Sequence, residues 1–310
     1  MSAEPLPVLC LAGPTGAGKT ELALRLARLF DCEIINADSR QVYADFPIVT
    51  AQPDSCQRAQ APHHLYGFLP ASAKFSAGEW LRRALPVCRA ITARRRLPLL
   101  VGGTGFYFNS LLHGFAEIPP VPAEISLALQ EQAASKGLAH LHERLCRLDP
   151  AYAAKIHPHD RQRILRSLEV CLATGKAFSW WHEHQHRKPQ AKGPLLVIAV
   201  SLAGLAPLLE RRIDAMLAKG AIEEARLALA SCADGSAPGW SGIGCAELHA
   251  YLQGRISLEE CRRLWLANTR AYAKRQLTWF RGRKDAIWIT PDDPEAILAI
   301  LKQSGYRPAA

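Results

Sequence analysis

Short apolar runs recur along the chain and alternate with longer segments in which apolar residues return every three or four positions. Short runs bounded by turn residues are typical of buried strands, and the longer periodic segments are typical of helices. The strand-like runs cover residues 8–12, 33–36, 97–101, 195–200 and 286–289. Because helix-like segments separate most of these runs, the pattern predicts an α/β fold with a mostly parallel sheet flanked by helices.

The pattern changes between residues 119 and 193, where no convincing strand is found. This stretch begins with Ile118-Pro119-Pro120-Val121-Pro122, which predicts a stiff linker. Helix-like segments follow at 124–135, 138–147 and 160–172, and Gly175 is a suitable stop for the last of them. We therefore predict a core formed by residues 1–118 and 190–310, interrupted by an all-helical insertion domain at 119–189. A further long helix is expected at 258–280.

The composition narrows the class of protein. Of the 310 residues, 49% are hydrophobic and 21% charged, as in ordinary globular proteins. The chain has no apolar run long enough to span a membrane and no N-terminal signal-peptide pattern, so we expect a cytoplasmic protein without a membrane partner. Nine scattered cysteines without a C-x-x-C pair argue against a disulfide framework or a cysteine zinc site. The net charge of +10 favours a polyanionic partner, most simply a nucleic acid.

The first strand-like run leads into a phosphate-binding motif. Residues 13–20 read Gly13-Pro14-Thr15-Gly16-Ala17-Gly18-Lys19-Thr20 and fit G-x-x-x-x-G-K-[ST] at every required position. A helix-like segment at 21–30 follows, so the motif has the strand-loop-helix context that it needs. Backbone N–H groups and the helix N-terminus would hold phosphate oxygens, Lys19 would reach them, and Thr20 would hold Mg²⁺. The core is thus predicted to be P-loop NTPase-like.

Two further polar motifs follow predicted strands. Asp38, in Asn36-Ala37-Asp38-Ser39-Arg40-Gln41-Val42-Tyr43, could hold a Mg²⁺ water or accept a proton from a nucleophile. An equally good alternative is that Asp38 caps a helix beginning near Ser39. Thr104, in Gly102-Gly103-Thr104-Gly105, provides a hydroxyl in a tight turn after the 97–101 run. Because ligands of open parallel sheets bind at the carboxyl ends of the strands, these motifs are expected near the phosphate loop.

Two helix-like segments carry clustered basic residues. Arg163 and Arg166 are i,i+3 neighbours on one helical face, which can grip phosphates or be a solvated stripe. The segment from Arg270 to Arg281 places Arg270, Lys274 and Arg281 on another face. Aromatic residues are interleaved with this second set, and core packing is the expected fate of two of them, Trp279 and Phe280.

Taken together, these motifs resemble those of the tRNA dimethylallyltransferase family, also called tRNA isopentenyltransferases. The resemblance runs from residue 9 to about residue 288 and is carried by six pieces in the family's order. These pieces are GPTGAGKT at 13–20, INADSRQVY at 35–43, PHHL at 62–65, LPLLVGGTGFY at 97–107, IHPHDRQRILRSLEV at 156–170 and RAYAKRQLTWF at 270–280.

The resemblance implies a reaction. Dimethylallyl diphosphate donates its five-carbon group to N6 of the adenosine just 3′ of the anticodon, with Mg²⁺ and loss of diphosphate. The tRNAs used are those reading codons that begin with U. It further implies Asp38 as the general base and Thr104 beside the transfer site. Lys19 and the phosphate loop, with Arg212, would hold the diphosphate. The family's compact bacterial type is expected to act as a monomer.

The same resemblance implies a tRNA-binding surface on this chain. Ser39, Arg40 and Gln41, with Asp38 and Thr104, fall where the family contacts the target adenosine and its neighbours. The segments expected to grip the anticodon stem-loop comprise Gln162, Arg163, Ile164, Leu165 and Arg166 in the insertion, and Lys274, Arg275 and Gln276 in the long helix.

Two segments depart from the family's usual pattern. Ile243-Gly244-Cys245-Ala246 lacks the tyrosine and basic residue common after Ile/Val-Gly, and Ile48-Val49-Thr50-Ala51-Gln52 replaces a common Ile-Gly-Thr-Ala-Lys. Both bear on tRNA affinity rather than on the chemistry.

Three other functions are compatible with parts of the sequence. A prenyltransferase acting on free adenine nucleotides would share the site but has no need of the basic helices. A P-loop small-molecule kinase would share residues 13–20 but not the other motifs in this order. A nucleotide-switched RNA-binding module would bind the same ligands without needing Asp38 for any activity.

Overall fold

The computed structural model describes residues 4–116, 118–184, 188–291 and 293–306. The chain divides into two compact units, one formed by Met1–Leu112 with Pro189–Ala310 and the other by His113–Lys188. The boundaries predicted from the sequence, 118/119 and 189/190, lie six residues and one residue later in the chain than these.

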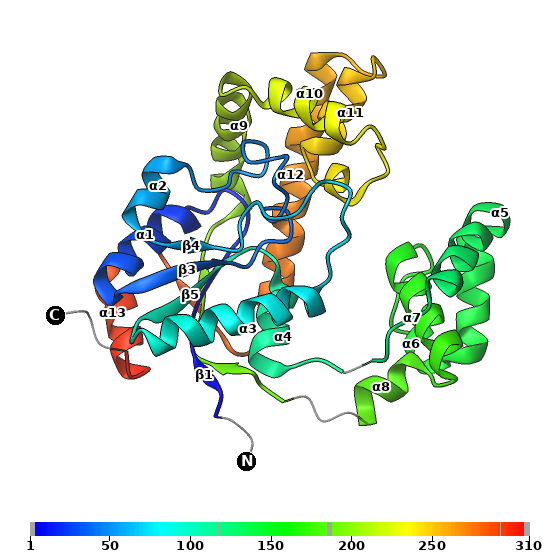
Figure 1. Cartoon of the computed structure of the whole chain (residues 1–310), viewed down its shortest axis with the longest axis horizontal. Helices are drawn as coiled ribbons and strands as arrows, with labels where there is room; N and C mark the ends of the chain where they lie inside the picture. Colours follow the sequence, from blue (N-terminus) through cyan, green and yellow to red (C-terminus); the bar gives the residue numbers. More distant parts are fainter. Residues whose placement is uncertain (1–3, 117, 185–187, 292, 307–310) are drawn as a thin grey trace. The chain divides into compact units, whose positions relative to one another are not determined.

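The first unit contains a six-stranded parallel sheet (Figure 1). Its strands, in spatial order, are β4 (His63–His64), β3 (Cys32–Asn36), β5 (Leu97–Gly102), β2 (Leu9–Ala12), β7 (Leu195–Ile198) and β8 (Ala286–Ile289). All residues of β2, β3 and β7 are buried. In a strand that is buried on both faces, the side chains on either face are mostly apolar. Such strands therefore appear as continuous apolar runs in the sequence.

The five predicted strands are confirmed, each within two residues of its expected ends. Three two-residue strands were not predicted: β1 (Leu6–Pro7), β4 and β6 (Ala191–Lys192). The prediction that no strand lies between residues 119 and 193 is wrong at its end, because β6 pairs in parallel with β1 there. Strands this short are defined by their partner and carry no periodic signal of their own.

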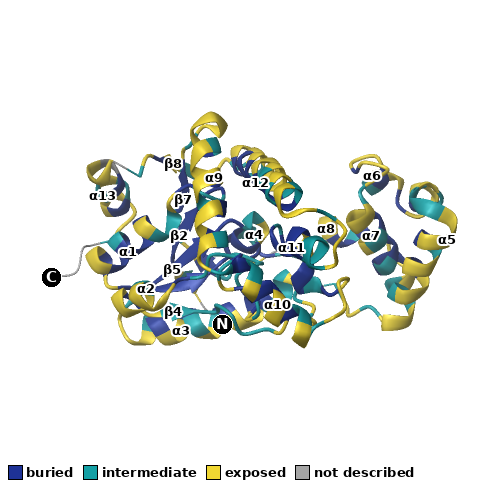
Figure 2. Ribbon diagram, turned by 90° about the horizontal axis from the view of Figure 1, so that it is seen from above, coloured by how far each residue is buried: buried dark blue, intermediate teal, exposed yellow. Residues whose placement is uncertain are grey.

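Helices cover the sheet and bury its apolar side chains (Figure 2). Helices α1 (Lys19–Phe30) and α13 (Pro294–Gln303) share a core with Leu9, Leu11 and Leu99. Helix α3 (Ala77–Ala93) contacts β5, and α4 (Gly105–His113) follows that strand. The short α2 (Ser55–Gln60) precedes β4. The sheet is therefore held in place by two layers of helix packing, as in other α/β folds.

A second core lies in the same unit, around Phe46, Trp240 and Trp265. It is formed by α9 (Leu202–Ala218), α10 (Ala221–Ser231), the 3₁₀ helix η1 (Pro238–Ser241), α11 (Cys245–Leu252) and α12 (Leu258–Arg281), together with the loop after β3. Helices α9 and α12 contact each other and stand side by side in Figure 1. This cluster fixes α9 and α12, the two helices from which Arg212 and Gln276 project.

The second unit is helical in its described residues, 113–116, 118–184 and 188. It contains α5 (Ala123–Leu148), α6 (Pro150–Ala153), α7 (Arg161–Thr174) and α8 (Phe178–His184), with a core that includes Leu141, Leu145 and Ile164. Helix α5 spans the two predicted helices and is interrupted at Gly137, whose φ of 81° is not helical. Gly175 ends α7 in the left-handed conformation, as predicted.

In the described part of the chain, no helix is both long enough and apolar enough to cross a lipid bilayer.

Candidate active site

Three adjacent strands of the sheet, β3, β5 and β2, end at the same edge and bring their polar motifs together. The Thr104 N–H, after β5, donates to the Ala37 carbonyl oxygen, after β3, at 3.2 Å. The Ser39 N–H donates to the Thr104 hydroxyl oxygen at 2.9 Å. The turns after β3 and β5 are thus joined directly, which places Asp38 beside Thr104.

The loop between β2 and α1 has the conformation of an anion-binding turn. Gly16 and Gly18 have φ values of 84° and 81°, in the left-handed region that favours glycine. A side chain at Gly16 would also lie 2.7 Å from a methyl group of Leu209 on α9, so this loop packs closely against that helix. Helix α1 begins at Lys19 without a side-chain cap, and its first N–H groups are available to an anion.

The Lys19 ammonium is held by carbonyl oxygens of this loop. Its Nζ donates to the carbonyl oxygens of Gly13 at 2.9 Å and Pro14 at 2.8 Å. An ammonium has three donors, so one remains for a phosphate oxygen. Burial lowers the pKa of Lys19 from 10.5 to about 8, the negative charge of Asp38 raises it and the positive charge of Arg212 lowers it further. Lys19, Asp38 and Arg212 therefore form one electrostatic group.

Arg212 enters this group from α9, the helix that packs closely against Gly16 of the phosphate loop. Burial lowers the pKa of its guanidinium, and the charge of Asp38 opposes that shift. Two partly buried cations beside one carboxylate leave an excess of positive charge, which an anionic ligand would balance.

Asp38 is oriented by the buried side chain of Asn36. The Asn36 Oδ1 accepts from the Asp38 N–H at 2.8 Å, and its Nδ2 donates to the Asp38 carbonyl oxygen at 3.0 Å. One carboxylate oxygen of Asp38, Oδ1, accepts from the Arg40 N–H at 2.8 Å. The other, Oδ2, has no hydrogen-bond partner among the described residues. The alternative that Asp38 caps a helix near Ser39 is wrong, because residues 37–54 contain no helix.

The oxygen atoms present fit Mg²⁺. Neither Asp38 Oδ2 nor the Thr20 hydroxyl is hydrogen-bonded within the described part of the chain, and both lie at the strand edge that carries the phosphate loop. No group of three or more His, Cys, Asp or Glu side chains is placed to bind a metal among the described residues. Mg²⁺ commonly takes one or two protein oxygens and keeps waters and substrate phosphates as its other ligands, so this donor set suits it.

Arg40 and Gln41 brace the loop that carries Asp38. Arg40 Nη1 donates to the Pro238 carbonyl oxygen at 3.2 Å and to the Ser241 hydroxyl at 2.9 Å. Gln41 Nε2 donates to the carbonyl oxygens of Thr50 and Ala51, at 3.0 and 2.7 Å. Both side chains are partly exposed and tie the second core to the site.

Glu224, which holds the same region from α10, was not among the predicted site residues. Its buried carboxylate accepts from the N–H groups of Ile48 at 2.6 Å and Val49 at 2.9 Å. Burial raises the pKa of Glu224, while the two backbone donors lower it. Because its partners are backbone groups 175 and 176 residues away, no local sequence pattern identifies it.

Gln276 links α12 to the phosphate loop. Its Oε1 accepts from the Thr15 N–H at 2.9 Å, and its Nε2 donates to the Gly103 carbonyl oxygen at 3.0 Å. The side chain is only 4% exposed. The structure therefore places Gln276 beneath the site rather than on the surface of α12.

The neighbours of Gln276 on α12 are exposed. Lys274 and Arg275 both face solvent, and the Arg275 guanidinium lies 5.5 Å from the centre of the Tyr272 ring. Phe280 is fully buried, as predicted, whereas Trp279 is only partly buried. Helix α12 thus presents basic groups on one face while its other face supports the site.

The predicted residues of the insertion divide in the same way. Gln162, Arg163 and Arg166 are exposed at the start of α7. Ile164 is fully buried and Leu165 packs against the same core, so their side chains support the helix. Both arginines are paired with nearby acids: Arg163 with Asp160, the N-cap of α7, at 3.4 Å, and Arg166 with Glu169 at 3.3 Å.

Comparison with known proteins identifies the family. The family model described as IPP transferase matches residues 41–283. The tRNA dimethylallyltransferase of Desulfovibrio desulfuricans is 56% identical over 304 residues, which is 98% of this chain and 93% of the relative. A relative that covers both chains so fully also aligns with the phosphate loop and Asp38, which precede the family-model match.

Solved structures give the same result. The full-length tRNA isopentenylpyrophosphate transferase of Bacillus halodurans is 32% identical and superposes with a TM-score of 0.68, covering 97% of this chain and 95% of that one. A eukaryotic dimethylallyltransferase acting on tRNA superposes with a TM-score of 0.80 at 27% identity, covering 97% of this chain and 77% of that one. With its strand-edge site and a match over most of its length, the chain belongs to the IPP transferase family.

Proposed function

We propose that this protein transfers the dimethylallyl group of dimethylallyl diphosphate to N6 of the adenosine on the 3′ side of the anticodon, position 37, in tRNAs reading codons that begin with U. The main support for this proposal is the group formed by Lys19, Arg212 and Asp38. In this group two cations beside the phosphate loop lie near a carboxylate, and one oxygen of that carboxylate accepts no hydrogen bond among the described residues. The relatives are named as dimethylallyltransferases that act on tRNA, and these names support the same reaction.

The cationic side of the site suits a leaving diphosphate. As the bond between the allylic carbon and the diphosphate oxygen breaks, its electron pair leaves with the diphosphate. Lys19, Arg212 and the N–H groups at the start of α1 stabilise the charge that develops there. When bound, Mg²⁺ would supply further neutralisation of the diphosphate, with the Thr20 hydroxyl as the protein oxygen that would hold it. No phosphoryl group moves in this reaction.

The anionic side of the site suits the nucleophile. The exocyclic amine of adenine is a poor nucleophile until its proton is removed, and Asp38 Oδ2 is the oxygen able to accept that proton. The Asn36 and Arg40 hydrogen bonds hold the backbone and the other carboxylate oxygen of Asp38 in place. The Thr104 hydroxyl accepts a hydrogen bond from the Ser39 N–H, which joins the loops after β3 and β5. In the proposed reaction this hydroxyl lies beside the carbon and nitrogen atoms that become bonded.

A tRNA base reaches such a site only when it leaves its stack. In the proposed complex the adenosine and its neighbours are contacted by the loop that carries Ser39, Arg40 and Gln41. The anticodon stem-loop lies on the exposed residues of α7 and α12. We infer that Gln276, Ile164 and Leu165 contribute to that surface through the shape of their helices, because their own side chains are engaged or packed elsewhere.

One assay separates this function from its alternatives. The protein is incubated with dimethylallyl diphosphate labelled in the allyl group, Mg²⁺, and either unmodified tRNA or AMP. We expect label in tRNA only. Label only in AMP would establish the free-nucleotide prenyltransferase, and ATP hydrolysis without label in either acceptor would establish a kinase-like or switch function. The monomeric state and the cytoplasmic location stay predictions.

A further inference from the structure

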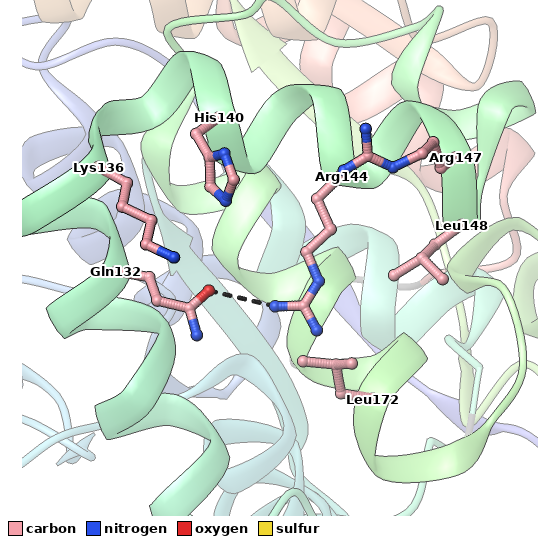
Figure 3. A pocket seen from close by; sticks show the side chains of 7 residues that line it. All are labelled: Gln132, Lys136, His140, Arg144, Arg147, Leu148 and Leu172. Atoms are coloured by element: carbon pink, nitrogen blue, oxygen red, sulfur yellow. Dashed lines mark hydrogen bonds between the residues drawn. The ribbon is translucent and has the colours of Figure 1, made fainter.

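The helical unit carries a basic hollow that is separate from the predicted tRNA-binding residues of α7. The hollow has a volume of about 440 Å³ and is lined by Gln132, Lys136, His140, Arg144, Arg147, Leu148 and Leu172. Six of these residues belong to α5, and Leu172 comes from the last turns of α7. Figure 3 shows Gln132, Lys136, His140 and Arg144 pointing into the same space.

The interruption of α5 at Gly137 creates this hollow. Arg144 Nη1 donates to Gln132 Oε1 at 3.2 Å, although the two residues are 12 positions apart. In an undisturbed helix that separation corresponds to roughly 18 Å along the axis, too far for the two side chains to meet. The non-helical backbone of Gly137 bends the helix so that residues before and after it face each other.

The charges that line the hollow are not neutralised by the protein. None of the lining residues is acidic. Lys136, Arg144 and Arg147 form no ion pair with any described carboxylate, whereas Arg163 and Arg166 of α7 are both paired. Three like charges held around one hollow repel one another, and a bound anion would relieve that repulsion.

The hydrogen bond from Arg144 to Gln132 also restricts the guanidinium. Only one of its five N–H donors is used in that bond, and the remaining donors form a planar fork suited to phosphate oxygens. Leu148 and Leu172, 44% and 38% exposed, form an apolar margin beside the cations.

We propose that this hollow is a phosphate-binding site, and that its principal ligand is the phosphate backbone of the RNA substrate. The inference about RNA rests on the proposed function, while the phosphate chemistry rests on the hollow alone. Contacts to phosphates fix the register of a protein on a nucleic acid without reading its sequence. The hollow would therefore anchor the RNA to the helical unit independently of the bases.

The salt dependence of tRNA binding tests whether the hollow binds the phosphate backbone of the RNA. Each lost phosphate contact lowers the slope of log K against log salt by about 1 and weakens binding to all sequences alike. For Lys136→Gln/Arg144→Gln we expect the slope to fall by about 1 to 2 and the Kd to rise several-fold. Lys136→Gln/Arg144→Lys, which keeps the positive charge at residue 144, should recover much of the tRNA affinity that the double glutamine variant loses.

A matched control removes a charge from the same unit but away from the hollow. Lys155 is exposed in the turn before α7, and Lys155→Gln should leave both the Kd and the slope unchanged. The substituted side chains lie outside the apolar core of this unit, so circular dichroism should show wild-type helix content in every variant. An unchanged slope in the folded double variant would overturn the RNA assignment.

His140 gives a direct readout of the phosphate chemistry. Its imidazole NMR signals should shift when inorganic phosphate or diphosphate is added, and this shift should be lost in Lys136→Gln/Arg144→Gln. A shift with unchanged tRNA affinity would identify free phosphate as the ligand, and no shift with unchanged affinity would overturn the proposal. The NMR result is independent of prenyl transfer, so a protein that failed the transfer assay could still pass this test.

Discussion

The side-chain amide of Gln276 and the backbone N–H of Thr15 are joined by a hydrogen bond of 2.9 Å across 261 residues of sequence. The same amide donates to the Gly103 carbonyl oxygen at 3.0 Å. One buried side chain on α12 thus satisfies a donor of the phosphate loop and an acceptor of the turn before Thr104. The helix proposed to bind tRNA and the loop proposed to bind diphosphate are therefore mechanically connected.

Removing this connection should destabilise the protein and weaken donor binding together. In Gln276→Ala the Thr15 N–H and the Gly103 oxygen lose their partner, at a cost of about 1–3 kcal/mol in the free energy of unfolding. Urea denaturation measures that loss, and isothermal titration with diphosphate should show a raised Kd. Gln303→Ala, at an exposed position of α13, serves as the control and should change neither quantity. Wild-type diphosphate affinity in Gln276→Ala would show that the bridge does not order the loop.

Replacing Asp38 should separate binding from chemistry. Asp38→Asn keeps the acceptor for the Arg40 N–H but removes the base, so kcat for prenyl transfer should fall by about 10²–10⁴-fold. Affinity for tRNA should change little, as measured by filter binding. Asp234→Asn removes an exposed carboxylate from the turn before η1, and this variant should transfer at the wild-type rate. Near-normal turnover in Asp38→Asn would refute the general-base assignment.

The lowered pKa of Lys19 predicts a pH dependence of donor binding. Because that pKa is about 8, Lys19 is charged below pH 8 and loses its proton as the pH rises from about 7 to 9. The KM for dimethylallyl diphosphate should therefore rise across this range. Lys19→Arg, which stays charged, should lack the midpoint near pH 8 whatever its absolute rate. The effect of Lys19 on the free energy of unfolding runs the other way, because its pKa is lower in the folded protein than in the unfolded chain. Between about pH 8 and 10.5 the unfolded chain binds more protons, so the contribution of Lys19 to the free energy of unfolding rises with pH in that range.

Glu223 and Glu224, neighbours on α10, allow a controlled test of the hydrogen bonds that hold the loop after β3. Glu224 is buried and accepts from the Ile48 and Val49 N–H groups, whereas the side chain of Glu223 is 63% exposed. Glu224→Gln presents an NH₂ group to one of those donors and should lower the free energy of unfolding by about 1–3 kcal/mol. Glu223→Gln should stay within about 0.5 kcal/mol of wild type in the same urea titration. Equal effects in the two variants would mean that the two backbone hydrogen bonds contribute nothing measurable.

The exposed basic residues of α12 predict a steep salt dependence of tRNA affinity. Lys274→Gln/Arg275→Gln should reduce the slope of log K against log salt by about 1 to 2 and raise the Kd for all tRNAs. Lys219→Gln/Lys302→Gln removes the same charge from exposed positions on α9's end and α13, and should leave the slope intact. A flat salt dependence of the wild-type protein would exclude α12 as a phosphate-binding surface.

Most of the fold could be predicted from the sequence because its strands are buried on both faces. Five strands were recognised as apolar runs, and the phosphate loop by its spacing. The two-residue strands could not be predicted, since each exists only through pairing with a distant neighbour. The break in α5 was visible as two adjacent helix-like segments, but nothing in them showed that Gln132 and Arg144 would meet across it.

Residue types and their spacing along the chain set the chemistry that the protein carries: a loop for phosphates, a carboxylate after the second core strand, a hydroxyl after the next, and basic helices. These are local properties, fixed by residue type and spacing. The way these features work together follows from the folded chain, because the sheet order β3-β5-β2 brings three strand ends to one edge. The fold also turned Gln276 inward to the phosphate loop and left Lys274 and Arg275 outside, and it assigned Glu224 to a loop 175 residues away. Such contacts depend on packing between distant segments, and packing is a property of the folded chain.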